Sequence, residues 1–319
     1  MNSKTFPQSD HFTFHELAEG VWAAIVKPTG LAASNSGIVD LGDRTLVFDT
    51  TLSPASAADL RNAAEYLTGR PVTCVLTSHK HPDHVFGNAV FAPETEFYAT
   101  ARTRELMMQQ TSADIMDFKK KWPELQKQWT ESARTAKDEA ERLDFEEGIQ
   151  FAQKVIDTFP QLELRLPDHT FSDRLEFKGS KRTAEFITFG GGHTDSDALL
   201  HLPVERILFT GDLLVVKNHP GLLSSHPREW LRILAKIKSL DPICLVPGHG
   251  ELGTLTDVTL IERYLNETLQ MAEQNWREGG TAESEAALQP PSFTEDWNNS
   301  EEFEANMKFL HAVVPQKIS

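Results

Sequence analysis

Residues 79–84 read His-Lys-His-Pro-Asp-His and come two residues after the apolar run "VTCVL" at 72–76. The hexapeptide holds three of the twelve histidines in the 319-residue chain. Without a cation, three imidazoles and a carboxylate this close together would repel one another or leave buried polar groups unsatisfied. The stretch therefore predicts a metal site at the end of a buried strand.

The spacing within the hexapeptide indicates two ions. In an extended loop residues i and i+2 point the same way, so His79 and His81 can reach one metal. Pro82 keeps His81 out of the helical region. Asp83 and His84 then turn away and can serve a second metal. Imidazole and carboxylate ligands without a nearby thiolate suit zinc, and also iron or manganese.

Three other polar residues follow apolar runs in the same way. "FITFGGG" precedes His193, "ILFTG" precedes Asp212 and "CLVPG" precedes His249. Ligands of α/β proteins collect where strands open into loops, so these residues are expected at one shared sheet edge. Asp212 has two carboxylate oxygens and can bridge two cations. Taken alone, each residue would more often be an ordinary core or surface residue.

The order of patterns predicts an α/β protein built as a four-layer αββα sandwich. Strand-like hairpins, a helix, a strand and a histidine-bearing loop occur in each half of the chain. Residues 101–160 lose the strand signals and have apolar residues at helical spacing, which predicts a helical insertion or lid between the halves. We expect a catalytic domain at 12–255 that includes this insertion, and a helical extension at 256–319 packed on it.

Four motifs in this order, "HKHPDH", "GGGHT", "TGDLL" and "PGHG", resemble the metal-binding motifs of the metallo-β-lactamase-fold hydrolase superfamily over about residues 15–255. The resemblance implies an αββα sandwich with a dinuclear zinc site. It assigns one metal to His79, His81 and His193, the other to Asp83, His84 and His249, and the bridging position to Asp212. Asp49, in "VFDT", matches an acidic position that would orient the ligands, although an ordinary turn cap is the alternative.

The resemblance implies a hydrolase in which two Zn²⁺ ions lower the pKa of a shared water, giving a hydroxide that attacks a small ester, thioester, lactone or lactam carbonyl. Asp83 and Asp212 are the expected catalytic carboxylates. Lys217 or His219 could contact a substrate carboxylate or phosphate, or could equally be solvated loop residues. A phosphodiesterase on the same fold and a non-hydrolytic or redox metal protein stay open. The acidic bridge favours the broader hydrolase branch over secreted class B β-lactamases.

The composition limits the kinds of molecule that the protein is expected to bind. The formal charge of −16 argues against nucleic-acid binding, and no run approaches the roughly 18 apolar residues of a membrane span. The N-terminus lacks a secretory pattern, and the two cysteines lie in apolar runs typical of buried reduced thiols, which together favour the cytoplasm. We expect a small-molecule substrate. No motif fixes the oligomeric state, and a homodimer stays open.

Overall fold

The computed structural model describes residues 6–314, except for the side chains of residues 110–112 and 114. Its strands form two sheets. The first sheet has, in spatial and chain order, β1 (Phe12–Ala18), β2 (Val21–Val26), β3 (Ser36–Asp40), β4 (Thr45–Phe48), β5 (Val72–Leu76), β6 (Glu96–Thr100) and β7 (His169–Phe171). The second has β8 (Arg174–Lys178), β9 (Thr183–Gly190), β10 (Asp197–Leu202), β11 (Ile207–Val215) and β12 (Cys244–His249). Pairing is antiparallel in β1–β4 and β8–β11, and parallel in β4–β7 and between β11 and β12.

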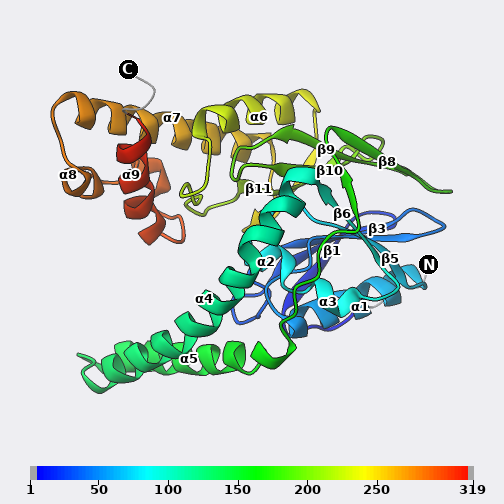
Figure 1. Cartoon of the computed structure of the whole chain (residues 1–319), viewed down its shortest axis with the longest axis horizontal. Coiled ribbons are helices and arrows are strands. Elements are labelled where there is room, and N and C mark those ends of the chain that lie inside the picture. The colour runs from blue at the N-terminus through cyan, green and yellow to red at the C-terminus, as the bar shows by residue number, and fades with distance from the viewer. Residues whose placement is uncertain (1–5, 315–319) are drawn as a thin grey trace.

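Three apolar clusters define four layers. The central cluster joins the two sheets and includes Leu46, Leu76 and Phe209. A second cluster packs α1 (Pro54–Thr68) and α3 (Asn88–Phe91) on the outer face of the first sheet. A third packs α6 (Pro227–Ser239) and α7 (Leu255–Arg277) on the second sheet, as Figure 1 shows. The predicted αββα sandwich is confirmed.

One glycine allows the two sheets to approach closely. A Cβ on Gly37 of β3 would lie 2.4 Å from the Phe209 ring of the opposite sheet. Real side chains do not approach so closely, and interiors at this density do not yield easily. The glycine therefore leaves room for an aromatic ring between the layers.

The insertion is a helical hairpin made of α4 (Ala101–Arg134) and α5 (Glu139–Ile156). It leaves the body after β6, and the chain returns through the short helix Phe159–Gln161 to add β7 at the edge of the first sheet. Phe118 packs on Phe86 and Trp122, with ring centroids 5.4 and 5.9 Å apart. These aromatic side chains fill the base of the hairpin, which extends from the sandwich in Figure 1.

The C-terminal extension continues from α7 through α8 (Ala282–Ala286) and the short helix Ser292–Thr294 to α9 (Glu301–Val313). Phe303 and Met307 of α9 belong to the same core cluster as Trp230 of α6. The extension therefore shares its core with the second sheet's helical layer. Residues 315–319 of the predicted extension lie outside the described part of the chain. Within residues 6–314, no helix combines the length and apolar character needed to cross a membrane.

Candidate metal centre

The hexapeptide forms the turn between β5 and the short helix α2 (Pro82–Val85). His81 caps this helix in an extended conformation, with φ −67° and ψ 148°, and Pro82 occupies its first turn. A proline disfavours helical geometry in the residue before it, which places the break between His81 and Asp83. The four polar side chains consequently divide into two pairs, as the sequence predicts.

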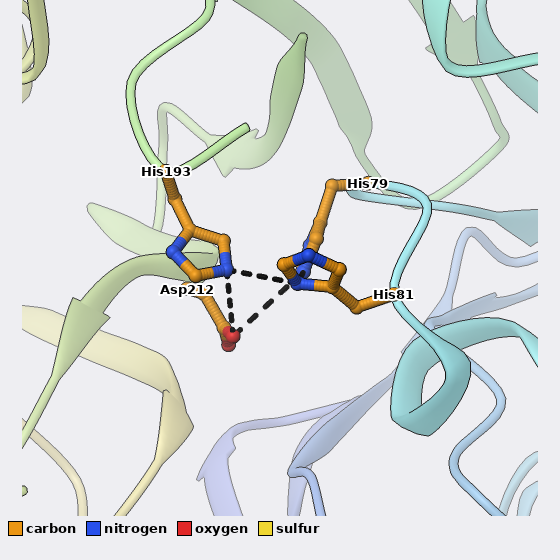
Figure 2. Close-up of side chains that lie close together, drawn as sticks. All are labelled: His79, His81, His193 and Asp212. Atoms are coloured by element: carbon orange, nitrogen blue, oxygen red, sulfur yellow. Dashed lines mark hydrogen bonds and ion pairs between the residues drawn. The ribbon is translucent and has the colours of Figure 1, made fainter. Parts of the chain in front are cut away.

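The first group of potential ligands is His79, His81, His193 and Asp212. Nδ1 of His81 lies 3.0 Å from Nε2 of His79 and 2.9 Å from Nε2 of His193. Figure 2 shows the three imidazoles and the carboxylate turned toward one point. Their ligand atoms all lie within 4.8 Å of one another, which is compatible with a single ion.

The second group is Asp83, His84 and His249. Oδ2 of Asp83 lies 3.4 Å from Nε2 of His84 and 3.3 Å from Nε2 of His249. His249 is the last residue of β12 in the second sheet. His84 lies on α2, which follows β5 of the first sheet. The structure therefore brings all seven predicted ligands to one edge of the sandwich.

Asp212 lies between the groups. Its Oδ2 is 3.7 Å from Nε2 of His79 and 3.3 Å from Nε2 of His193. Its Oδ1 is 3.2 Å from Nε2 of His84 and 3.3 Å from Nε2 of His249. Each oxygen thus faces one group. Asp212 lies inside β11 rather than after its end, at a point where the pairing with β12 is irregular.

Hydrogen bonds to backbone carbonyls join the N-terminal and C-terminal halves of the chain beside the candidate metal centre. The Ala198 N–H donates to the Ser78 carbonyl at 2.9 Å, connecting β10 to the hexapeptide loop. The Asn35 side-chain amide donates to the carbonyls of Pro247 and Gly250 at 3.0 and 2.8 Å. These contacts hold residues from distant parts of the sequence in one register.

Asp49 supports the ligands from behind. Its buried carboxylate contacts Nδ1 of His84 at 2.8 Å and accepts the Ser78 backbone N–H and hydroxyl at 2.7 Å each. The Ser78 hydroxyl in turn contacts Nδ1 of His79 at 2.9 Å. One carboxylate thereby orients one histidine of each group, an arrangement typical of metal sites. Ser78 was not predicted, and its only sequence signal is its position before His79.

Asp197 orders the loop that carries His193, and the sequence patterns did not predict this role. Its buried carboxylate accepts the backbone N–H groups of Gly192 at 2.7 Å and Thr194 at 3.1 Å, and the Thr194 hydroxyl at 2.9 Å. The three donors come from the two residues that flank His193, and they fix the loop around the Asp197 carboxylate. The imidazole is consequently positioned before any ion binds.

The donor set fits divalent cations. Nε2 of His84 and Oδ1 of Asp212 are buried and approach within 3.2 Å, yet neither forms a hydrogen bond. Buried polar atoms normally have partners, so two unsatisfied atoms aimed at one point indicate a position that suits a cation. Imidazole nitrogens and carboxylate oxygens without thiolates suit zinc, iron or manganese.

In the first group, the pKa values favour the protonation states that bind metal, namely neutral imidazoles and an ionised carboxylate. Burial lowers the pKa of His79 well below its usual value, and burial together with His193 lowers the pKa of His81 to about 3. Both imidazoles are therefore neutral, which is the form that binds metals. Burial alone would raise the pKa of Asp212, but His249 and His84 hold it well below its usual range. The carboxylate is ionised at neutral pH.

A cavity of about 310 Å³ opens over the two groups. His219 lines it; its Nδ1 lies 3.2 Å from the Tyr264 hydroxyl, and its Nε2 makes no hydrogen bond within residues 6–314. Lys217 does not line this cavity, because it points to Asp296, with 2.5 Å between the charged atoms. The structure therefore brings His219 to the site and leaves Lys217 outside it.

Glu302 of α9 is a lining residue that no sequence motif indicated. A Cβ placed on Gly221 would lie 3.7 Å from Oε2 of Glu302 and 3.9 Å from Cε1 of His193, so these two side chains flank the same backbone position. Among the described residues, no lysine or arginine lines the cavity. The cavity wall thus carries the Glu302 carboxylate, whereas the sequence had suggested Lys217 as a positive group for a substrate carboxylate or phosphate.

Gly248 provides a direct test of the geometry. A Cβ at this position would lie 1.9 Å from Oδ1 of Asp212. We expect Gly248→Ala to displace the carboxylate, lower the metal content and reduce hydrolysis about 10²-fold, since shifts near 1 Å have effects of this size. Mass spectrometry of bound metal and rate measurements would check this.

Gly69→Ala is the matched control. Its Cβ would meet nothing within 4 Å, and its φ of +72° adds only backbone strain far from the ligands. Unchanged metal content and rate in Gly248→Ala would show that Asp212 is not held where the structure places it.

An αββα sandwich with two groups of His and Asp side chains at one edge defines a class of metal-binding α/β protein. The family model of the metallo-β-lactamase superfamily matches residues 29–249. The chain belongs to the metallo-β-lactamase superfamily, as the motif resemblance implies.

Known relatives agree with this assignment. The type 2 metallo-β-lactamase of Bacteroides fragilis is 27% identical over 123 residues, which are 37% of this chain and 49% of that protein. The chain thus spans about half the length of this curated relative. Solved metallo-β-lactamases from Pontibacter korlensis and Hirschia baltica are each 17% identical, with TM-scores of 0.59 and 0.55. The similarity covers 80% and 79% of this chain and 99% and 98% of theirs, and it shows a shared fold.

Proposed function

We propose that the chain is a zinc-dependent hydrolase that holds two Zn²⁺ ions and cleaves a small ester, thioester, lactone or lactam. The observation that carries this proposal is the placement of Asp212, whose two oxygens face the two ligand groups separately. His79, His81 and His193 would hold one ion, and Asp83, His84 and His249 the other. When bound, the ions supply Lewis acidity and lower the pKa of a coordinated water.

The chain's own residues contribute orientation and proton handling. Asp83 contacts His84 and His249 through Oδ2, and its Oδ1 forms no hydrogen bond within residues 6–314. Burial alone would raise the pKa of Asp83, but His84 and His249 hold it well below its usual range, so Asp83 faces the cavity as an ionised carboxylate that can accept a proton at Oδ1 in passing. Nε2 of His219 is free to contact the substrate. Glu302 would offset part of the charge of two bound Zn²⁺ ions, and no lysine or arginine among the described residues lines the cavity, which together favour neutral small molecules over anions.

Metal removal tests the proposal. Extraction of metal with a chelator should abolish hydrolysis and lower the melting temperature by about 8 °C or more, because the cations bind only the folded state. Adding back Zn²⁺ should restore both. The measurements are metal content by mass spectrometry, thermal unfolding, and rates with an ester, a thioester, a lactone, a β-lactam and a phosphodiester.

The substrate panel separates the proposed function from its alternatives. About two zinc ions per chain with cleavage of a carbonyl substrate supports the proposal. Cleavage of the phosphodiester alone would identify a phosphodiesterase on this fold. Stoichiometric iron without hydrolysis of any panel member would refute a zinc hydrolase.

A further inference from the structure

A second cavity, of about 400 Å³, lies beside the metal cavity, and Ser224 lines both. The Ser224 hydroxyl is 3.4 Å from Nε2 of His81, whereas Nδ1 of the same ring faces the other ligands. One histidine therefore presents one nitrogen to the metal ligands and the other toward the shared serine. A molecule in the metal cavity can extend past Ser224 into the second cavity.

Apolar side chains from three segments line the second cavity. Leu106 comes from α4 of the insertion, Pro227 from the start of α6, and Phe309 and Val313 from α9. The insertion and the C-terminal extension thus meet at this place, next to the residues proposed to hold metal. Leu106, Pro227, Phe309 and Val313 form an apolar part of the wall, and Lys80, Thr194, Asp195, Ser224, Ser225 and His226 supply its polar part.

The acidic group at the second cavity is already paired. Asp195 accepts a hydrogen bond from Arg102 at 2.6 Å and contacts Nε2 of His226 at 2.9 Å. Lys80, also at this cavity, has no ion-pair partner among the described residues. The Asp195 carboxylate is thus not available for a second cation site, and the four apolar side chains of the wall remain to contact an apolar group of a ligand.

An exposed leucine continues the apolar surface into the metal cavity. Leu223 lines that cavity directly before Ser224 and is 64% exposed. Leu223 and the shared Ser224 are consecutive residues, so the chain segment between the two cavities presents an apolar side chain on the metal-cavity side.

We propose that the second cavity binds the apolar chain of the substrate, an acyl or alkyl chain of medium length, while the carbonyl to be cleaved lies among the metal ligands. This inference rests on the proposed hydrolase function. Each methylene group that leaves water for these walls favours binding, so selectivity should grow with chain length. The chain lies on the acyl side or the alcohol side of the bond, and the test distinguishes the two.

The test compares zinc-loaded wild type and variants on matched esters. p-Nitrophenyl acetate and octanoate vary the acyl chain, and ethyl and octyl acetate vary the alcohol. We expect kcat/KM to be about tenfold higher for the long member of one pair. Phe309→Ala should reduce this ratio about fivefold, and Val313→Trp, which fills the cavity, should remove it. The ratio of the long to the short ester is the readout, because a general loss of activity lowers both rates of a pair and leaves their ratio unchanged.

Lys308→Ala is the control, because Lys308 is exposed on the same helix and pairs with Glu304. It should leave the chain-length ratio unaltered. Equal kcat/KM for short and long members of both pairs would overturn the inference while leaving the hydrolase intact.

A binding measurement keeps the inference testable if none of these esters is cleaved. Calorimetric titration with the neutral octanamide should give a Kd about tenfold weaker for Val313→Trp than for wild type. Equal affinity in the two proteins, or no binding to wild type, would overturn the inference independently of catalysis.

Discussion

Replacing Asp212 with asparagine should lower hydrolytic activity about 10³-fold and release at least one of the two cations, the largest effect we expect. The amide keeps the shape of the side chain but has one oxygen and no charge. In the structure each carboxylate oxygen lies 3.2–3.7 Å from histidines of a different group. An amide can serve only one of these groups, so the other ion loses its shared ligand.

The matched control is Asp241→Asn, which makes the same chemical change where 73% of the side chain is exposed and Arg206 is its partner. Metal content by mass spectrometry, circular dichroism and the rate on the best panel substrate should be measured for both variants. Two cations and full activity in Asp212→Asn would contradict the bridging position.

Asp49→Asn should weaken cation affinity about 10–100-fold and reduce activity to a similar extent, because Asp49 orients ligands of both groups. The carboxylate accepts from Ser78 twice and contacts His84. An amide places an NH₂ donor against one of these partners. His84 would then lose the hydrogen bond that fixes its ring. Competition with a chromophoric chelator gives the affinity.

Asp40→Asn separates this effect from a loss of stability. Asp40 is also buried, 5% exposed, and pairs with Arg70 and with Lys181 at 2.9 Å, but it contacts none of the proposed ligands. This variant should lower the melting temperature without changing cation affinity. If Asp49→Asn behaves like Asp40→Asn, its carboxylate stabilises the fold and does not orient the metal ligands.

The sequence predicted the elements whose signals are local. α1 spans Pro54–Thr68, with Ser53 as its cap and Gly69 in the left-handed region after it, and a Ser-Pro pair before a helical stretch that ends at glycine is a local signal of this kind. Capping and positive φ depend on the immediate neighbours, so sequence patterns reveal them. The extended conformation of His81 before Pro82 is a similar local effect.

Residues that reach the site from distant segments of the chain could not be recognised from any sequence motif. Glu302 lies 53 positions after His249 and reaches the cavity only because α9 packs on α7. Lys217 and His219 looked equivalent in the sequence, yet the left-handed φ of 51° at Lys217 accompanies an outward side chain that pairs with Asp296, whereas His219 is buried at the cavity. Such choices depend on the packing of whole elements.

The sequence by itself determined the kind of chemistry and the seven residues that can supply it, because imidazoles and carboxylates crowded after buried strands have few stable uses other than binding cations. Tertiary structure alone decided that Asp212 faces the two groups with separate oxygens, that Asp49 supports both, and that the insertion and extension enclose a second cavity. The physical reason is that a ligand's identity is a property of one side chain, whereas its direction depends on the register of two sheets and the helices packed on them.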